Sequence, residues 1–300
     1  MSDAFLAVIN PAAGGGRCRN LVAPALDRLR SGGIALEMAE TEGPGHASEI
    51  VRQASARGYR KFIAVGGDGT SYEIVNGLFP QDSSRERPTL AFLPLGTGNS
   101  FLREFTERGV EHAIEALLAG RSQPCDVLRM RHAEGVIHYL NLLSMGFAAD
   151  VAALRARRFR SWGELGYQSS IFVSLLRLQR RPFPLCVDKD AEMDRRPCLF
   201  LTFNNSKFTG GTMMIAPQAE VNDGLIEYVR WGPIGRIGLI RNLPTLYDGT
   251  HVHHPLAERR SAKQIDFYLD AAVDVMVDGE VLSLQCKTLD VLPGVINVVV

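Results

Sequence analysis

The sequence lacks the features that mark several specialised classes of protein. Its five cysteines are scattered and form no C-x-x-C pair, which favours reduced structural thiols and a cytoplasmic setting. Lysine plus arginine and aspartate plus glutamate both total 33, so no excess of positive charge indicates nucleic-acid binding. No apolar run approaches the roughly 18 residues of a membrane-spanning helix, and the first residues carry no basic region typical of a signal peptide. We therefore expect a cytoplasmic globular protein that binds no nucleic acid.

The length and composition instead predict a protein with two hydrophobic cores. The chain has 300 residues, of which 46% are hydrophobic and 22% are charged. This composition is ordinary for a globular protein, and the length is typical of two domains. The sequence pattern changes near Cys125, so we predict one domain at residues 1–124 and a second at residues 125–290.

Short apolar runs alternate with helical patterns in the first domain. The runs lie at residues 4–9, 34–39, 61–65 and 89–93. This alternation predicts a parallel sheet covered by helices. Glycine-rich loops follow three of the runs, at residues 10–17, 66–70 and 94–100. Because open α/β sheets bind ligands at the carboxyl ends of their strands, three such loops together predict a ligand site at this edge.

The loop at residues 66–70 (GGDGT) is the most informative of the three. Its glycines let a ligand approach the backbone closely, and the helix after it would direct N–H groups at a phosphate. Thr70 and Glu73 have the spacing of a capping box, so we expect the helix to begin at Thr70. A carboxylate at Asp68 beside a phosphate requires an intervening cation, usually Mg²⁺. A tight turn with a helix cap and a solvated Asp68 is the alternative interpretation.

The second domain has a pattern typical of antiparallel strands. We expect strands at residues 126–130, 137–143, 198–203, 225–231, 264–269, 273–277, 281–285 and 295–300, with turns at 222–224, 278–279 and 293–294. One helical segment at residues 150–181 interrupts the strands, and it opens with Arg155, Arg157, Arg158 and Arg160. This basic run would either dock on an anionic membrane surface or form a solvated face beside a core helix.

The motifs taken together resemble those of the lipid kinases with a diacylglycerol-kinase catalytic domain. This family includes YegS-like proteins, bacterial diacylglycerol kinases and sphingosine kinases. The matching segments are residues 10–17 (NPAAGGGR), the loop at Thr41, 66–70, 94–99 (PLGTGN), 204–205, 210–211, 215–217, 222–225 and 278–280. At position 100, where many bacterial members carry Asp, this chain carries Ser100, which puts a carboxylate role there in doubt.

The resemblance implies a fold and a set of cofactors. The implied fold is a three-layer α/β domain with a parallel sheet, like that of phosphofructokinases and NAD kinases, followed by a mostly antiparallel β-sandwich domain. Residues 291–300 would return to the first domain as a strand. The implied cofactors are ATP and Mg²⁺. The positions that match ATP-binding residues are Asn10, Pro11, Ala12, Ala13, Gly14, Arg17, Thr41, Gly66, Gly67, Asp68, Gly69, Thr70, Thr97 and Asn99.

The resemblance also implies metal and catalytic residues. Glu220, Asp223 and Leu225 match a metal site, and Asp126 would reach that metal through water. Oxygen ligands of this kind suit Mg²⁺. The resemblance makes Glu280 the general base that takes the proton of the acceptor hydroxyl, with Asp278 supporting it and Asp68 as a further catalytic residue.

Several of these positions have simpler interpretations on their own. The segments 222–224 and 278–279 are also ordinary tight-turn sequences. Arg17 would either add a cation to the phosphates or begin a helix and face solvent. The histidines at positions 251, 253 and 254 predict a polar loop rather than a zinc site, because no cysteine or carboxylate partner is near them in sequence.

The predicted function is a kinase that transfers the γ-phosphate of ATP to a lipid hydroxyl, on a diacylglycerol-like lipid, a sphingoid base or phosphatidylglycerol. The alternatives are a kinase for a soluble alcohol or NAD, and a non-catalytic lipid- or nucleotide-binding protein. A dinucleotide-dependent oxidoreductase is disfavoured because no G-x-G-x-x-G follows the first strand. The expected partners are the lipid, ATP and a membrane surface contacted peripherally, and a homodimer stays open.

Overall fold

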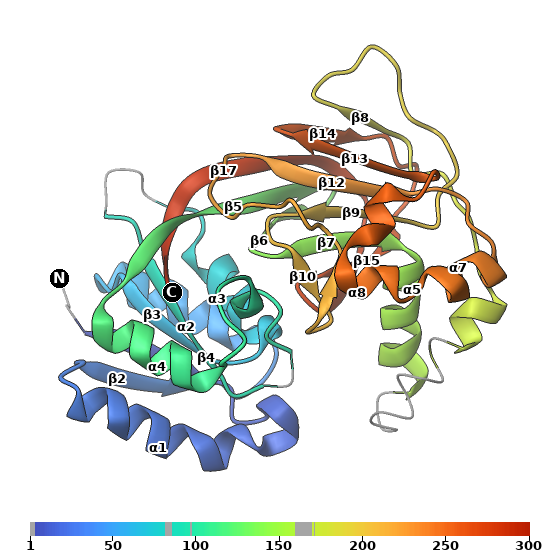
Figure 1. The fold of residues 1–300 in the computed structure, drawn as a ribbon. Helices are drawn as coiled ribbons and strands as arrows, with labels where there is room; N and C mark the ends of the chain where they lie inside the picture. Colours follow the sequence, from blue (N-terminus) through green and yellow to red (C-terminus); the bar gives the residue numbers. More distant parts are fainter. Residues whose placement is uncertain (1–3, 82–85, 97, 160–169, 171) are drawn as a thin grey trace. The chain divides into compact units, whose positions relative to one another are not determined.

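The computed structural model describes residues 4–81, 86–96, 98–159, 170 and 172–300. The chain divides into two compact units, which are described separately below. Unit 1 comprises Met1–Val127 and Leu292–Val300, and unit 2 comprises Leu128–Val291. Strands β5 (Ser122–His132) and β17 (Cys286–Val299) each contribute residues to both units. Figure 1 shows the elements of the two units along the chain.

Unit 1 is built on a parallel sheet. Its strands are β2 (Leu36–Glu40), β1 (Phe5–Ile9), β3 (Lys61–Gly66), β4 (Thr89–Pro94) and the end of β17, in that order. Each neighbouring pair is parallel. Strands β1, β3 and β4 are short, mostly apolar and buried, as expected for strands that are covered on both faces, whereas the edge strand β2 carries two glutamates and is largely exposed. The predicted parallel α/β architecture is therefore confirmed.

Helices cover both faces of this sheet. They are α1 (Cys18–Ser31), α2 (His46–Ala56), α3 (Asp68–Leu78) and α4 (Val110–Ala119), with short 3₁₀ turns at Ala13–Gly16 and Leu102–Glu104. Leu26 and Leu29 of α1 and Ile114 and Leu117 of α4 are buried in one cluster with alternate residues of β1, β3 and β4. Alternation along a strand directs the remaining strand residues to the opposite face, where α2 contacts β1 and α3 contacts β3.

Unit 2 contains a six-stranded antiparallel sheet. Its order is β13 (Ala257–Ala262), β12 (Ile226–Trp231), β9 (Phe200–Asn204), β7 (Leu142–Gly146), β15 (Val273–Val277) and β16 (Glu280–Leu284). A second group of strands joins β8 (Leu185–Val187), β14 (Gln264–Phe267), β17, β5 and β6 (Gly135–Tyr139). Phe203 of β9 meets Phe267 of β14 edge to face at 5.3 Å, so aromatic side chains join the two groups. This packing confirms the predicted β-sandwich.

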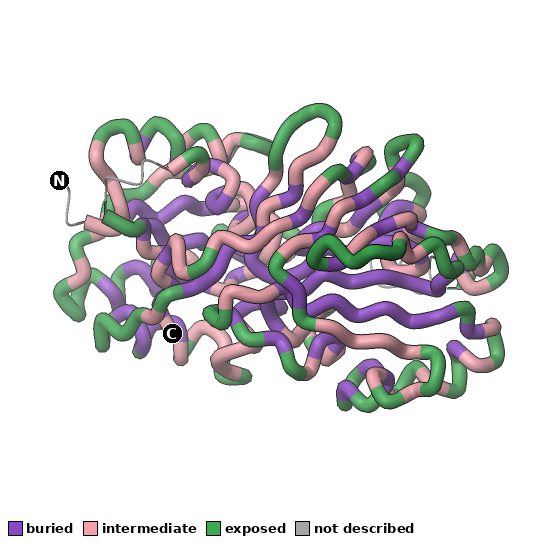
Figure 2. The backbone as a smooth tube through the Cα atoms, turned by 90° about the horizontal axis from the view of Figure 1, so that it is seen from above, coloured by how far each residue is buried: buried purple, intermediate pink, exposed green. Residues whose placement is uncertain are grey.

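Unit 2 also contains several short helices and a short hairpin. They are α5 (Phe147–Leu154) with a π-helical turn at Arg155–Phe159, a helical stretch at residues 172–176, the hairpin β10 (Phe208–Thr209) and β11 (Met213–Met214), α7 (Arg236–Asn242), α8 (Thr245–Asp248) and a 3₁₀ turn at Thr250–His253. Figure 2 shows the buried backbone concentrated in the strands of both units, with exposed backbone in the helices and loops. Within the part of the chain that is described, no helix is long and apolar enough to cross a membrane.

Two structural predictions need correction. The expected helix at residues 150–181 ends early, because residues 178–181 have no helical structure; Arg160, the segment up to residue 169 and residue 171 lie outside the described residues. The expected turn at residues 293–294 lies instead inside β17. Gly294 has a φ of 55° and its N–H donates to the Asp126 carboxylate at 2.7 Å, so the pair forms an irregularity in a strand rather than a chain reversal.

The burial of His138 in β6 predicts a pH-dependent stability. Desolvation and, secondarily, the Arg129 charge lower the pKa of His138 to about 4. In the unfolded chain the pKa is about 6.5, so folding favours neutral His138 and this stability is lost as pH falls from 6.5 through 4. The contribution to the free energy of unfolding falls by about 2 kcal/mol between pH 7 and pH 5.

The variant His138→Gln cannot titrate, and we expect a flatter stability profile between pH 7 and pH 5 than that of the wild-type protein. Thermal unfolding followed by circular dichroism at pH 7, 6 and 5 measures this difference. Parallel profiles for the two proteins would contradict it.

Candidate functional site

The loops that follow β1, β3 and β4 are bonded to one another at the carboxyl edge of the unit 1 sheet. The Asn10 N–H donates to the Val65 carbonyl at 3.0 Å, and the Gly96 N–H donates to the Gly66 carbonyl at 2.9 Å. The Asp68 N–H donates to the Gly98 carbonyl at 3.0 Å. The three glycine-rich loops therefore form one connected surface, as their positions in the sequence predict.

Glycine is required where these loops cross. A Cβ atom at Gly96 would lie 2.7 Å from the Cα and N atoms of Gly67, and a Cβ at Gly67 would lie 2.8 Å from the Gly98 carbonyl oxygen. Both distances are shorter than a carbon contact allows, so any side chain at either position forces the backbones apart. The absence of side chains also leaves the backbone open to a ligand.

Asn10 connects the first of these loops to the second. Its Oδ1 accepts the Ala12 N–H at 3.1 Å, and its Nδ2 donates to the Thr70 Oγ1 at 3.3 Å. Beyond it, Gly14 and Gly15 have positive φ angles of 64° and 68°. Successive residues of this kind form a concave turn of N–H groups that suits an anion. Pro11 and Ala13 lie in the same turn, half-buried, beside an exposed Ala12.

The Arg17 side chain forms a hydrogen bond with this loop. Its Nε donates to the Gly14 carbonyl at 3.0 Å, and the side chain is exposed. The guanidinium group therefore steadies the turn from its outer end, at the start of α1. Arg17 thus stands at the start of a helix and faces solvent, as the second sequence-based interpretation expects, and in addition it bonds the loop.

Asp68 is the first residue of α3, and its carboxylate is held by the third loop. Both oxygens lie 3.0 Å from the Ser100 N–H. Desolvation raises the pKa of Asp68, and hydrogen bonds from Ser100 and the Phe101 backbone oppose that rise. A small cavity borders the carboxylate, and its lining includes Gly66 and Ser71.

Position 100 contributes to the Asp68 contact through both its backbone and its side chain. The Ser100 main-chain N–H donates to Asp68, and a hydrogen bond from the Ser100 side chain also lowers the pKa of that carboxyl. Asn99 donates its Nδ2 to the Gly96 carbonyl at 3.2 Å and so closes the same loop. Gly69 lies in the first turn of α3, and Thr97 lies outside the described residues.

The predicted capping box is wrong, because α3 begins at Asp68 rather than Thr70. Glu73 instead reaches across to the loop at Thr41. Its Oε1 accepts the Gly45 N–H at 2.8 Å, and its Oε2 accepts the Ala47 N–H at 3.0 Å. The two carboxylate oxygens thus cap α2 and fix the loop that leaves β2. The sequence spacing pointed to a partner three residues away, whereas the real partners lie 28 and 26 residues upstream.

The turn at Asp278 in unit 2 is a tight hairpin between β15 and β16. Asp278 and Gly279 have positive φ angles of 46° and 88°, and Val277 pairs with Glu280. The Asp278 carboxylate is buried and accepts the N–H groups of Leu140, Asn141 and Leu142 at 2.9–3.1 Å. It therefore fixes the turn against the start of β7. Glu280 follows as an exposed first residue of β16.

A buried amide cluster surrounds the same backbone. Asn141 Oδ1 accepts the Ser206 hydroxyl at 2.5 Å, and Asn205 Nδ2 donates to the Leu140 carbonyl at 2.9 Å. The sequence motif at residues 204–205 thus supports the segment that Asp278 holds. Asn141 and Ser206 were not among the predicted site residues, and nothing in their local sequence distinguishes them.

The predicted metal ligands are divided between the units. Glu220 and Asp223 are exposed in a turn of unit 2, where Asp223 Oδ1 accepts the Leu225 N–H at 2.9 Å. Asp126 belongs to unit 1 and is buried. Across the described residues, no three His, Cys, Asp or Glu side chains gather as a metal cluster. One carboxylate together with main-chain oxygens is nevertheless a donor set that fits Mg²⁺, which usually keeps several waters.

Comparison with known proteins gives matches over nearly the whole chain. The sequence model of the diacylglycerol kinase catalytic domain matches residues 4–130, and that of the YegS C-terminal NAD kinase beta sandwich-like domain matches residues 141–300. A diacylglycerol kinase of Mycobacterium tuberculosis is 26% identical over 297 residues, covering 97% of this chain and 93% of that protein.

A protein of Cronobacter sakazakii named "Probable lipid kinase YegS-like" is 27% identical, covering 90% of this chain and 87% of its own. Among solved structures, a diacylglycerol kinase of Bacillus anthracis superposes with a TM-score of 0.74 at 20% identity, covering 99% of this chain and 96% of the other. This structural likeness supports the fold.

The contacts of Glu73 predict that it controls the order of the loop before α2. In Glu73→Gln, the remaining side-chain oxygen accepts one of the two backbone N–H groups, and the amide NH₂ group faces the other N–H group. We expect amide hydrogen exchange at Gly45 and Ala47 to accelerate about tenfold, which corresponds to roughly 1.4 kcal/mol for a weakened charged hydrogen bond.

The matched control is Glu49→Gln, an exposed glutamate of α2 that bonds the Gln53 side chain. It should leave exchange at Gly45 and Ala47 unchanged. Equal exchange in Glu73→Gln and the wild-type protein would show that the carboxylate does not hold this loop.

Proposed function

We propose that this chain, which belongs to the family with a diacylglycerol kinase catalytic domain, is a kinase that transfers the γ-phosphoryl group of ATP to a lipid hydroxyl in the presence of Mg²⁺. The observation that carries the proposal is the connected surface of three glycine-rich loops around Asp68. Backbone N–H groups at the carboxyl edge of a parallel sheet, next to a helix N-terminus, suit the phosphates of a nucleotide. The names of the relatives favour a lipid acceptor.

Unit 1 supplies the nucleotide site in this proposal. The turn after Asn10 and the loops at Gly66 and Asn99 hold the phosphates through main-chain N–H groups, and Arg17 and Glu73 keep their loops in place. Phosphoryl transfer depends mainly on such positioning and on neutralisation of charge. Asp68 lies at this surface, and its carboxylate would repel a phosphate unless a cation lay between the two groups.

Mg²⁺, when bound, would neutralise charge that develops on the transferred phosphoryl group. In unit 2 the residues that would hold it are Asp223 through its carboxylate and Glu220 and Leu225 through main-chain oxygens. Asp126 would act through water, and its carboxylate also receives the Gly294 N–H at 2.7 Å.

Glu280 is the general base in this proposal, and Asp278 is its positioning residue. Three backbone N–H groups occupy the Asp278 oxygens, so that carboxylate is committed to holding the turn. Glu280 is exposed at the adjoining strand start, where it can meet the hydroxyl of an incoming lipid. A positioned base of this kind contributes about 10²- to 10⁴-fold to the rate.

The proposal extends to the setting of the reaction. A lipid acceptor requires contact with a membrane surface, and we place the protein in the cytoplasm at that surface. Within the basic run, Arg157 pairs with Asp274 at 2.8 Å, which reduces the charge that it can offer to lipid. A diacylglycerol-like lipid is the favoured acceptor because the relatives carry that name. Soluble alcohols and NAD are retained as acceptors to be tested.

The roles of Glu280 and Asp278 predict a clear difference between two variants. With radiolabelled ATP, Mg²⁺ and detergent-dispersed acceptors, we expect the wild-type protein to label a lipid rather than NAD or a sugar phosphate. Glu280→Gln retains the shape of the side chain but cannot accept a proton, so the turnover rate should fall at least about 100-fold with little change in the ATP KM.

Glu134→Gln, an exposed glutamate of unit 2, is the matched control and should retain wild-type turnover. Asp278→Asn should lower the unfolding temperature as well as activity, because one backbone N–H then faces an amide group. If Glu280→Gln stays active while Asp278→Asn is inactive but stable, Asp278 is the base. If NAD is labelled and no lipid is, the acceptor has been assigned to the wrong class.

A further inference from the structure

An exposed apolar surface lies on two helical segments of unit 2. Among the described residues, twelve large apolar side chains are exposed, and six of these belong to residues 172–176 and 236–248. They form what we call the apolar surface: Phe172 (62% exposed), Leu176 (55%), Ile237 (68%), Ile240 (53%), Leu243 (37%) and Tyr247 (57%). Scattered exposed apolar residues are normal in proteins, but a group of this kind marks an interaction site.

These six side chains are not needed to attach their helices to the fold. Other residues of the same segments do that, because Leu239 and Leu246 are buried and Leu175 and Leu178 pack against the same hydrophobic cluster. Each segment therefore buries some of its apolar side chains and exposes others, and in α7 the exposed ones lie beside exposed arginines. Exposed apolar side chains that gather in one region are expected to be covered by a partner or by lipid.

The two segments are joined to each other. The Arg236 guanidinium donates from Nε to the Leu175 carbonyl at 3.0 Å and from Nη2 to the Leu176 carbonyl at 2.6 Å. The Arg180 Nε in turn donates to the Ile234 carbonyl at 3.0 Å. These bonds bring the end of the 172–176 helix to the start of α7, so the apolar side chains of both segments share one region.

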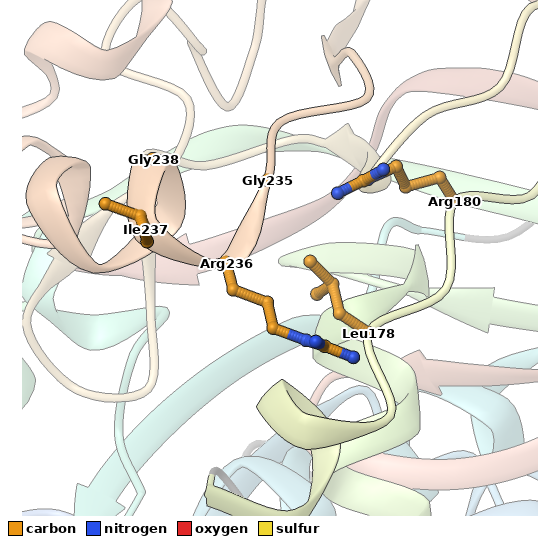
Figure 3. Close-up of a pocket in the computed structure, with 6 residues that line it drawn as sticks. All are labelled: Leu178, Arg180, Gly235, Arg236, Ile237 and Gly238. Atoms are coloured by element: carbon orange, nitrogen blue, oxygen red, sulfur yellow. The ribbon is translucent and has the colours of Figure 1, made fainter.

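A hollow of about 570 Å³ opens between the segments, lined by Leu178, Arg180 and residues 235–238. Figure 3 shows the side chains of Arg180 and Arg236 reaching into the space between the two segments, on either side of Leu178. The hollow thus combines apolar carbon atoms with two cations. That combination matches a lipid headgroup phosphate next to the start of an acyl chain.

Charge around the apolar surface is mostly positive. Residues 170–187 and 232–248 contain five arginines (Arg177, Arg180, Arg181, Arg236 and Arg241) and one acidic residue, Asp248. Of these, Arg181 is paired with Asp150 at 2.6 Å. An apolar face bordered by arginines is the composition of a segment that lies in the interface of an anionic membrane, where arginine binds lipid phosphates and the apolar side chains enter the headgroup region.

We propose that the apolar surface docks unit 2 on an anionic lipid bilayer. Phe172, Leu176 and the side chains of α7 enter the headgroup region, and Arg236 and Arg241 bind anionic headgroups beside them. The proposal rests on the proposed function in that docking would bring the enzyme to its lipid acceptor. It is separate from the basic run at Arg155, because it depends on exposed apolar side chains and on different arginines.

The test is sedimentation with vesicles, one set of phosphatidylcholine alone and one of phosphatidylcholine with phosphatidylglycerol. We expect the wild-type protein to bind the anionic vesicles, to bind the neutral ones at least about tenfold more weakly, and to lose affinity as salt is raised. The double variant Ile237→Ser/Ile240→Ser should bind anionic vesicles at least about tenfold more weakly than wild type, because two apolar side chains no longer enter the interface.

The matched control is Leu21→Ser/Val136→Ser, which removes two side chains of similar exposure (51% and 47%) from other elements. It should bind like the wild-type protein. For charge, Arg241→Glu should weaken binding to anionic vesicles, and Arg19→Glu, an exposed arginine of α1, should not. Phe172→Ser provides an independent test on the other segment if the double variant does not fold.

Activity on detergent-dispersed lipid separates this proposal from the proposed function. The surface variants should keep wild-type turnover on lipid in micelles and lose it on vesicles. Wild-type protein that binds vesicles but phosphorylates no lipid would refute the kinase and leave the docking surface standing. Equal vesicle binding by the wild-type protein, Ile237→Ser/Ile240→Ser and Phe172→Ser would overturn the docking proposal. Variants that change from dimer to monomer but keep their vesicle binding would also overturn it.

Discussion

The close approach of backbones at the carboxyl edge of the unit 1 sheet is the constraint on which the candidate site depends. Gly67 and Gly96 cross so tightly that no side chain fits at either position, and this crossing brings the Ser100 N–H to both oxygens of Asp68. The same edge receives Asn10 from the first loop. The glycines are thus needed for geometry, and the exposed backbone that they leave is what suits a phosphate.

In unit 2 a buried carboxylate, rather than a crossing of glycines, fixes the position of the backbone. A single buried carboxylate, Asp278, gathers three backbone N–H groups from the start of β7 and so determines where Glu280 begins β16. Buried carboxylates are stable when several donors surround them. In both units, therefore, a carboxylate held by main-chain donors sits beside the residues to which we assign chemistry.

The sequence predicted what depends on local pattern and missed what depends on distant partners. Apolar runs identified the parallel sheet, glycine-rich loops identified the edge at which its loops meet, and alternation identified the antiparallel domain, because these patterns reflect burial and backbone geometry directly. Glu73 was misassigned because its real partners, Gly45 and Ala47, lie in another loop. Helix α7 was missed because it is only seven residues long, contains Gly238 and exposes Ile237 and Ile240, so its apolar residues show no helical periodicity.

The central claim is that the crossing of the glycine-rich loops forms a nucleotide site, and the affinity of Gly96→Ala for ATP with Mg²⁺ tests it most directly. Isothermal titration should show affinity at least about tenfold weaker than wild type, because the added methyl group separates the loops at Gly67. Gly235→Ala, where a Cβ meets only the flexible Arg180 side chain at 3.5 Å, should bind like wild type. Wild-type affinity in a folded Gly96→Ala protein would contradict the account.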